Sequence, residues 1–198
     1  CCAPIRGAVS REPNWQPLNR SICANPMPRS LPSSFPGAER PAAVGSSEER
    51  GGDHRFTTLV AEQIGWVVEI ERHSFACPWT AIDFDEIIRD RSAVSLAMLL
   101  REEGIGYAVG YVDGADFHLA NLAIAVSQRR QGWGRALLYE MLRTAREKGC
   151  RTCSLEVRES NSSGIELYRC CGFRQIGVQT GFYSRPRENA LVMRAGIE

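Results

Sequence analysis

The sequence predicts one α/β domain built on a mixed, mostly antiparallel sheet and flanked by about four helices. Two observations carry this prediction. Strand-like and helix-like runs follow one another in the order strand, helix, helix, strand, strand, strand, helix, strand, helix, strand, strand. The three successive strands are joined by short turns, which favours antiparallel pairing, whereas the later strands alternate with helices. With 198 residues, 43% of them hydrophobic, the chain is long enough for one sizeable core.

The elements in the first half of the domain are predicted from local spacing. They are one strand, two helices and three strands, at residues 56–60, 61–75, 81–90, 93–100, 105–112 and 117–124. Ile64, Val67 and Val68 recur at helical spacing in the first helix. Thr80 and Asp83 have the spacing of a capping box, which predicts that the second helix begins immediately after Thr80.

The second half of the domain alternates helices with strands. A helix begins near Gly132 and runs through ALLYEMLRTAREKG, a strand follows at 153–157, and a helix in NSSGIELYRCCGF is ended by Gly172. Two strands, 177–183 and 189–194, complete the sheet. The helix after Gly132 has an apolar face that we expect to pack on the sheet, made of Leu137, Leu138, Met141, Leu142 and Ala145.

Residues 1–52 differ in composition from the domain at 53–198. They are rich in Pro, Ser and Arg and show neither helical nor strand periodicity, so we expect a disordered N-terminal extension. A basic, Ser-containing stretch with few acids is also typical of an organellar transit peptide. The sequence begins at Cys1 rather than at Met, so a misassigned start is a third interpretation.

Composition narrows the partners. The formal net charge is +1, which argues against direct nucleic-acid binding, because phosphate binding needs clustered Lys and Arg. No apolar run reaches the ~18 residues that a membrane-spanning helix needs. We therefore expect neither a nucleic acid nor a membrane as the partner.

Eight cysteines raise the question of a metal or redox site. Cys150-x-x-Cys153 and the Cys170-Cys171 pair have spacings that zinc sites and thioredoxin-like motifs also use. Cys153 falls inside a predicted strand, however, and no His lies nearby to complete a ligand set. We expect no metal and interpret the cysteines as reduced, partly buried thiols.

The stretch RRQGWGR (129–135) places bare backbone and positive charge at the start of a helix. Helix N-termini carry unpaired N–H groups and partial positive charge, and glycines let a ligand approach the backbone closely. The stretch therefore predicts a phosphate or pyrophosphate site, with an exposed glycine loop as the alternative. No Gly-Lys-Ser/Thr follows, which excludes a P-loop. Leu137 stands where a dinucleotide fingerprint requires Gly or Ala.

Two stretches of the sequence resemble the GNAT acetyltransferases. Strand NLAI, then Arg129-x-x-Gly132-x-Gly134 and a long amphipathic helix, are similar to the acetyl-CoA motif of that family. SLEVRESNSSGIELYRCCGF resembles the LEVR-x-SN-x-x-A-x-x-LY-x-x-x-GF stretch of one branch, the RimI-type ribosomal-protein-alanine N-acetyltransferases. FACPW and FYSRPRENALVM also match in kind, so that the resemblance covers roughly residues 55–198.

The resemblance implies a sheet that is splayed open between its fourth and fifth strands, with acetyl-CoA as the co-substrate in the gap. The backbone of Leu122, Ala123 and Ile124 is expected to bind the acetyl and pantetheine end. Asn161 matches a position that contacts coenzyme A, and it is also explained as a helix N-cap. The pyrophosphate is expected on the loop formed by Arg129, Arg130, Gln131, Gly132, Trp133, Gly134 and Arg135.

The same resemblance assigns Glu156 as the general base and Tyr168 as the general acid of direct acetyl transfer. Taken from the residues alone, Glu156 is better explained as a surface-facing or salt-bridged carboxylate, and a core tyrosine fits the position of Tyr168 well. An amine with a pKa of about 7.7–8.0 must lose a proton before it attacks the thioester, and Glu156 would accept it directly or through water. Backbone N–H groups near Ile124 would stabilise the oxyanion.

The C-terminal hairpin is expected to shape the acceptor slot, with Tyr183 and Glu188 as candidate substrate residues. Phe182 and Asn189 depart from the Tyr-Tyr and Glu-Asp pairs that are usual in the branch. No role is assigned to the three histidines, His54, His73 and His118. His118 falls in a predicted strand, from which it could line a water path.

The resemblance implies an enzyme that acetylates the N-terminal α-amine of a protein, with the N-terminal Ala of ribosomal protein S18 as the acceptor. It also implies a monomer in the cytoplasm, or in a plastid or other organelle if the extension is a transit peptide. Two alternatives stay open. One is a GNAT enzyme that acetylates another peptide, a lysine or a small amine, and the other is a non-catalytic coenzyme A-binding module.

Overall fold

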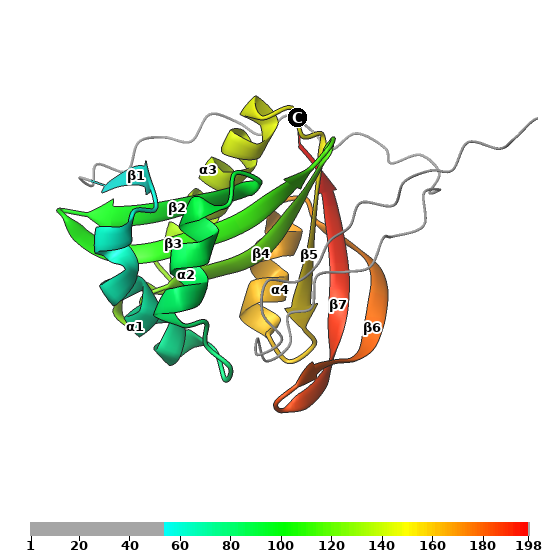
Figure 1. The fold of residues 1–198 in the computed structure, drawn as a ribbon. Coiled ribbons are helices and arrows are strands. Elements are labelled where there is room, and N and C mark those ends of the chain that lie inside the picture. Colours follow the sequence, from blue (N-terminus) through cyan, green and yellow to red (C-terminus); the bar gives the residue numbers. More distant parts are fainter. Residues whose placement is uncertain (1–53, 198) are drawn as a thin grey trace, which may run out of the picture.

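The computed structural model describes residues 54–197, and the predicted extension at 1–52 lies outside the described residues. One seven-stranded sheet runs through the domain in the order β1-β2-β3-β4-β5-β7-β6. In Figure 1, α1 and α2 cover one face of the sheet and α3 and α4 lie behind the other. The predicted α/β class, the mixed sheet and the four flanking helices are confirmed for the described part of the chain.

The order of elements is also the predicted one. The strands are β1 (His54–Thr58), β2 (Ala93–Leu100), β3 (Glu103–Asp113), β4 (Asp116–Ile124), β5 (Thr152–Arg158), β6 (Arg174–Ser184) and β7 (Arg187–Gly196). The helices are α1 (Ile64–Ser74), α2 (Ala81–Arg89), α3 (Trp133–Glu147) and α4 (Ser162–Cys170), with short 3-10 turns at Ala61–Gln63 and Val126–Gln128. Gly172 follows α4 with a φ of 88°, the left-handed conformation expected of a residue that ends a helix.

The first strand is displaced by two residues, because the sequence predicts it at 56–60 and the structure places it at 54–58. Leu59 follows the strand, and its side chain is buried in the smaller core cluster, where it is only 1% exposed. Its N–H still donates to Ser95 O at 3.0 Å, which holds the turn against β2. The first three residues of the helix predicted at 61–75 form the separate 3-10 turn.

Two clusters of buried side chains fill the two faces of the sheet. The larger lies under α3 and α4, and α3 buries Leu137, Leu138, Met141 and Ala145 completely, as its apolar face predicts. The smaller cluster lies under α1 and α2, around Phe84. Each face of the sheet is thus covered by its own pair of helices.

Strands β4 and β5 are paired over a short distance only. They run parallel, and Asp116–His118 is the whole of β4 that pairs with β5, opposite Thr152–Ser154. From Leu119 to Ile124, β4 pairs with β3 alone, across an irregularity between Val109 and Gly110. β5 continues along β7 to Arg158. The sheet therefore opens between its fourth and fifth strands, as the resemblance implied.

Side chains tie the three strands together at the closed end of this opening. Asp116 of β4 accepts hydrogen bonds from Thr152 of β5 and from Arg194 of β7, and Arg194 Nη2 also donates to Thr152 Oγ1 at 2.8 Å. This network lies at the first paired residues of β4 and β5, so the strands are held where they meet and diverge beyond it.

The predicted capping box of α2 is present, and its removal is a test of the local structure. Thr80 Oγ1 accepts from Asp83 N at 3.3 Å, and Asp83 Oδ2 accepts from Thr80 N at 2.6 Å. We expect Thr80→Ala to lower the free energy of unfolding by about 1 kcal/mol, the usual contribution of an N-cap side chain. Urea denaturation followed by circular dichroism measures the change, and a loss below ~0.3 kcal/mol would contradict this account of the helix start.

Candidate active site

The glycine loop before α3 leaves backbone donors without acceptors. Gly132 adopts a φ of 91° and precedes the first residue of α3. The first backbone donors of this helix are Arg135 and Ala136, and both reach Gly132 O at 3.1 Å. Within residues 54–197, the N–H groups of residues 131–134 have no protein acceptor. The loop therefore presents the free donors and the partial positive charge that an anion needs.

The basic residues of this loop differ in what they contact. Arg129 is engaged by the protein, because its Nε donates to Ile124 O at 2.9 Å and its Nη2 to Ser74 Oγ at 2.8 Å. All of Arg129, Arg130, Gln131 and Arg135 are exposed. The predicted pyrophosphate contact is therefore open to Arg130, Gln131 and Arg135, whereas Arg129 connects the end of β4 to the end of α1.

The side chain of Trp133 points toward β1 and the core. Its ring lies 5.3 Å from the ring of His54 on β1, and it packs against the larger core cluster. What Trp133 offers a ligand is consequently its backbone N–H. Gly134 sits where α3, α4 and β4 converge, since a Cβ at this position would lie 3.5 Å from Leu167 and 3.9 Å from Ile124.

The edge of β4 that faces the opening is available to a ligand. Leu122, Ala123 and Ile124 pair with β3 on one side, and on the side of β5 no strand of the described residues 54–197 pairs with them. An extended molecule can lie along this edge and use its peptide groups as a strand would. Together with the glycine loop at its end, the opening fits a long ligand that carries phosphate groups.

Asn161 caps α4 in the predicted manner. Its side-chain oxygen accepts from Gly164 N at 2.9 Å, which satisfies one free donor of the first helical turn. The N-cap interpretation is confirmed. A contact between Asn161 and coenzyme A stays a prediction.

Glu156 is a buried carboxyl group beside the opening. Leu155 and Val157 point into the core under α3 and α4, so Glu156 points to the opposite face of the sheet, the side of α1 and α2. Its side chain is 5% exposed, and burial raises its pKa from 4.5 to about 7. A carboxyl group with this pKa changes protonation state near neutral pH, which suits a general base.

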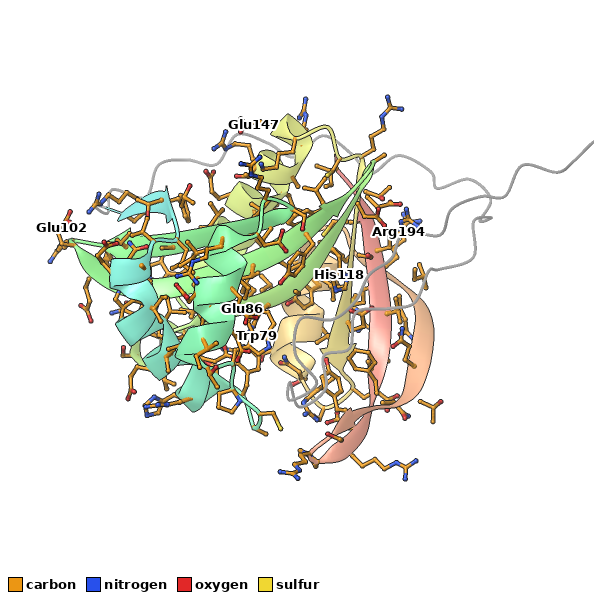
Figure 2. The ribbon with its side chains drawn as sticks, viewed as in Figure 1. Trp79, Glu86, Glu102, His118, Glu147 and Arg194 are labelled. Carbon is orange, nitrogen blue, oxygen red and sulfur yellow. The ribbon has the colours of Figure 1, made fainter. Side chains whose placement is uncertain are left out.

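His118 faces Glu156 across the point where the strands part. Its Nε2 lies 3.4 Å from Glu156 Oε2, and its Nδ1 is buried with no hydrogen-bond partner among the described residues. Burial lowers the pKa of His118 to about 4, so the imidazole is neutral near pH 7. Sequence reasoning assigned His118 no role, because nothing in the chain links positions 118 and 156 before the strands are aligned. Figure 2 shows His118 beside β5.

Tyr168 lies on the other face of the sheet. It lies on α4, packs against the larger core cluster, and its ring stands 5.7 Å from that of Phe173. Burial raises the pKa of Tyr168 well above its ordinary value, and the neighbouring Tyr183 acts in the same direction. The phenol therefore keeps its proton throughout the neutral range.

Tyr183 connects the C-terminal hairpin to the strand of Glu156. Its hydroxyl donates to Glu156 O at 3.4 Å, and Arg158 lies 4.0 Å from the centre of its ring. Burial raises the pKa of Tyr183 to about 12, against the opposing effect of the Arg158 charge. Tyr183 is thus held beside both candidate catalytic groups.

Glu188, the other candidate substrate residue, is occupied within the protein. Its Oε1 accepts from Ser160 N at 2.6 Å and its Oε2 from Arg158 Nη1 at 3.0 Å. The Ser160 N–H keeps the pKa of Glu188 below its ordinary value. In this structure Glu188 braces the hairpin against the end of β5, and acceptor binding by its carboxylate stays a prediction.

Sequence reasoning missed a second buried carboxyl group on the same face of the sheet. Glu71 of α1 is 1% exposed and accepts hydrogen bonds from Trp79 N, Tyr107 and Asn121. Burial raises its pKa to about 7. The signal was present in the sequence, because Glu71 follows Val67 and Val68 at the spacing of the buried stripe of the helix.

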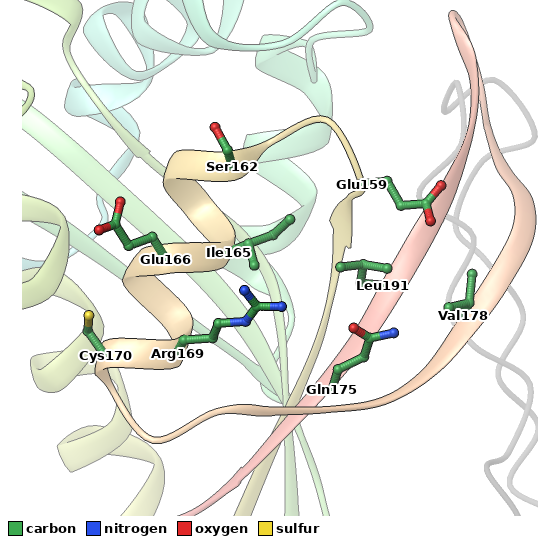
Figure 3. Close-up of a pocket in the computed structure, with 9 residues that line it drawn as sticks. All are labelled: Glu159, Ser162, Ile165, Glu166, Arg169, Cys170, Gln175, Val178 and Leu191. Carbon is green, nitrogen blue, oxygen red and sulfur yellow. The ribbon is translucent and has the colours of Figure 1, made fainter.

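The cysteines and one pocket are further places where chemistry could occur. Cys150 and Cys153 are free buried thiols, and no group of His, Cys, Asp and Glu among the described residues is arranged to hold a metal ion. An open pocket of about 560 Å³ lies between α4 and β6–β7 (Figure 3). Glu166, Arg169 and Leu191 are among its lining residues, which include none of the candidate site residues.

A comparison with protein families shows the family of the chain. The model of the acetyltransferase (GNAT) family matches residues 64–173, which include the glycine loop, Glu156 and Tyr168. The chain belongs to the GNAT acetyltransferase family. It is therefore an acyltransferase of a family that uses acetyl-CoA, and the resemblance seen in the sequence is confirmed.

Relatives in the GNAT family match this chain over most of their own length. The [ribosomal protein bS18]-alanine N-acetyltransferase of Escherichia coli K12 is 32% identical over 146 residues, which cover 72% of this chain and 97% of the relative. The enzyme of the same name from Haemophilus influenzae is 33% identical over 128 residues, 63% of this chain and 86% of the relative. The crystal structure of the ribosomal-protein-S18-alanine N-acetyltransferase from E. coli superposes with a TM-score of 0.68 at 26% identity and covers 73% of this chain and 94% of that one.

Among the described residues, no helix is both long and apolar enough to cross a membrane.

The conformation of Gly132 provides a test of the coenzyme site in this GNAT domain. We expect Gly132→Ala to raise the Kd for coenzyme A roughly tenfold, because an L residue at a φ of 91° is strained by about 1–2 kcal/mol and the loop must shift. Isothermal titration calorimetry measures the Kd. Gly149→Ala is the matched control, since Gly149 has the same φ of 91° and open surroundings at the other end of α3. Equal losses of affinity in both variants would show that the loop is not the binding site.

Proposed function

We propose that this protein transfers the acetyl group of acetyl-CoA to the N-terminal α-amine of a protein, with the N-terminal Ala of ribosomal protein S18 as the acceptor. The observation that supports the proposal is the buried Glu156 carboxyl, which lies 3.4 Å from His118 where β4 and β5 part and has a pKa raised to about 7, as suits a proton acceptor. The names of the E. coli and H. influenzae relatives support the acceptor.

The residues of the opening would hold the co-substrate in a defined order. The free N–H groups of residues 131–134 would bind the pyrophosphate, with the exposed Arg130 and Arg135 adding charge. The uncovered edge of Leu122–Ile124 would bind the pantetheine and acetyl end, and Asn161 would contact the coenzyme from the start of α4. When bound there, acetyl-CoA supplies a thioester-activated acetyl group.

Glu156 would take the proton that the attacking amine must lose. Its carboxylate lies on the face of the sheet away from α3 and α4, so the acceptor would enter from that side. The neutral His118 faces the carboxylate and has a free Nδ1, which suits a water that relays the proton. The new N–C bond then forms as the S–C bond of the thioester breaks.

Tyr168 would return a proton to the departing sulfur. The raised pKa keeps its hydroxyl protonated until a stronger base, the thiolate, is generated beside it. Backbone N–H groups at the end of β4, near Ile124, would stabilise the negative charge that develops on the carbonyl oxygen. Tyr183 would border the acceptor beside Glu156.

The decisive experiment compares acceptors and variants. We expect thiol release from acetyl-CoA with peptides that begin with Ala or Ser and carry a free α-amine, and none with an N-terminally blocked peptide. Glu156→Gln and Tyr168→Phe should each lower kcat/KM by about 10²–10⁴-fold, the usual contribution of general acid–base catalysis. Their unchanged Kd for coenzyme A is the control. Turnover only on lysine side chains or small amines would show that the acceptor is not a protein N-terminus. Coenzyme binding without any turnover would favour a binding module.

The pH dependence of this reaction is a separate test of the base. Both Glu156 and the acceptor amine must be deprotonated, so kcat/KM should rise with pH through about 7 and level off above ~8. In Glu156→Gln the limb near pH 7 should disappear and only that of the amine should remain. An unaltered limb near pH 7 in Glu156→Gln would show that a group other than Glu156 is the base.

We further propose that the domain at 53–198 is sufficient for activity and that residues 1–52 take no part in catalysis. Deletion of residues 1–52 should leave kcat/KM within about twofold of the full chain, because every group assigned above lies beyond them. Thermal unfolding of the two proteins controls for folding. A folded deletion variant that has lost turnover would show that the extension contributes to the site.

A further inference from the structure

Glu71 joins three separate segments of the chain with one buried carboxyl group. Trp79 N, in the loop between α1 and α2, donates to its Oε1 at 2.9 Å. Tyr107, on β3, donates its hydroxyl to Oε2. Asn121, on β4, donates from Nδ2 to both oxygens at 3.3 Å. A carboxyl group that is 1% exposed is costly to bury, and these donors offset that cost.

The partner on β4 is a residue of the opening. Asn121 lies in the stretch from Leu119 to Ile124, where β4 has lost its pairing with β5. Glu71 therefore fixes the loop at residues 75–80 directly to the strand along which the acetyl end of the co-substrate is placed. On the same strand, immediately before the opening, His118 faces Glu156.

A second polar tie binds the same end of α1 to the same strand. Ser74, the last residue of α1, accepts from Arg129, and Arg129 also donates to the carbonyl of Ile124. The final turn of α1 is thus fastened to β4 at Asn121 and at Ile124. The loop at 75–80 leaves α1 directly from this anchored turn, and Trp79 N ties its far end to Glu71.

The anchored loop borders the face from which the acceptor would enter. α1 and α2 pack on this face of the sheet against Ala123 of β4, and the half-buried Trp79 packs on the same cluster. Glu156 and His118 lie on this face at the neighbouring strands. Figure 2 shows Trp79 and His118 on the side of the sheet that α1 and α2 cover. The opposite border is the β6–β7 hairpin, through Tyr183 and its bond to Glu156 O.

We infer that Glu71 is a positioning residue for the acceptor: through Trp79 N and Asn121 it sets the distance between the loop at 75–80 and β4, and thereby the width of the acceptor slot. The inference rests on the proposed function, because it assumes an acceptor that enters over Glu156. Glu71 itself is too deeply buried to touch the acceptor, so its effect passes through the loop.

The experiment uses the full chain and four variants. Glu71→Ala removes both acceptor oxygens, Glu71→Gln keeps one oxygen for Trp79 N, and Tyr107→Phe removes one donor while keeping the ring that packs edge-on against Phe84. Glu69→Gln is the matched control, because Glu69 is an exposed carboxylate on the same helix. Initial rates give kcat, the KM for an Ala-starting peptide and the KM for acetyl-CoA. Hydrogen–deuterium exchange with mass spectrometry follows segment 75–80.

We expect Glu71→Ala to raise the KM for the peptide roughly tenfold, the effect of one lost hydrogen bond to a charged group, with kcat and the KM for acetyl-CoA within about twofold. Exchange in segment 75–80 should accelerate at least tenfold, since the Trp79 amide loses its acceptor. Glu71→Gln should restore most of the slow exchange and part of the KM. For Tyr107→Phe, the KM for the peptide and the exchange rate should lie between those of Glu71→Gln and Glu71→Ala. For Glu69→Gln, both should match the wild type.

Three results would overturn the inference. A lower kcat with unchanged KM values would show a merely structural role, and a higher KM for acetyl-CoA would place the effect at the coenzyme. Unchanged exchange in segment 75–80 would show that Glu71 does not hold the loop. If Glu71→Ala does not fold, Glu71→Gln and Tyr107→Phe give the same comparison. If the wild type acetylates no N-terminal peptide, the proposed function fails, while the exchange data still decide whether Glu71 positions the loop.

Discussion

The short pairing of β4 with β5 is the constraint on which the rest of the site depends. Only Asp116–His118 pairs with β5, and the network of Asp116, Thr152 and Arg194 holds the strands where they meet. Each strand remains supported on its outer side, β4 by β3 and β5 by β7, so the divergence exposes a backbone edge without unfolding either strand. The divergence of β4 and β5, here called the seam, therefore leaves each strand held in the sheet by its other neighbour.

In the proposed reaction, the seam allows groups on opposite faces of the sheet to act together. Glu156 lies on the face of α1 and α2, and Tyr168, a residue of α4, lies on the other face. In a continuous sheet a strand would separate them. Burial acts on both in the same direction and favours the protonated form, which in the proposed reaction would make Glu156 a base effective near neutral pH and keep Tyr168 a proton donor. His118, neutral for the same reason, adds no charge to the seam.

Local patterns predicted the elements, whereas side-chain partnerships across the fold had to be seen in the structure. Helical spacing, the capping box at Thr80 and the glycine before α3 each involve residues a few positions apart. They can therefore be recognised in the sequence alone. The contact of His118 with Glu156 joins residues on two strands, and Glu71 meets partners 8, 36 and 50 positions away. Such pairs depend on the register of the strands, which periodicity alone does not specify.

Charged residues in a recognisable motif therefore divide into two kinds, and only the fold separates them. Arg129 and Glu188 both belong to stretches that resemble the family, yet the donors of Arg129 are engaged by Ile124 O and Ser74, and the oxygens of Glu188 by Ser160 N and Arg158. A ligand that displaced these partners would leave a buried carbonyl or an arginine unsatisfied, and that penalty would offset the free energy of the new hydrogen bond. This penalty supports the proposal that the ligand binds mainly to the backbone donors of the glycine loop and to the edge of β4 that faces the opening. The engaged side chains hold those two surfaces in place.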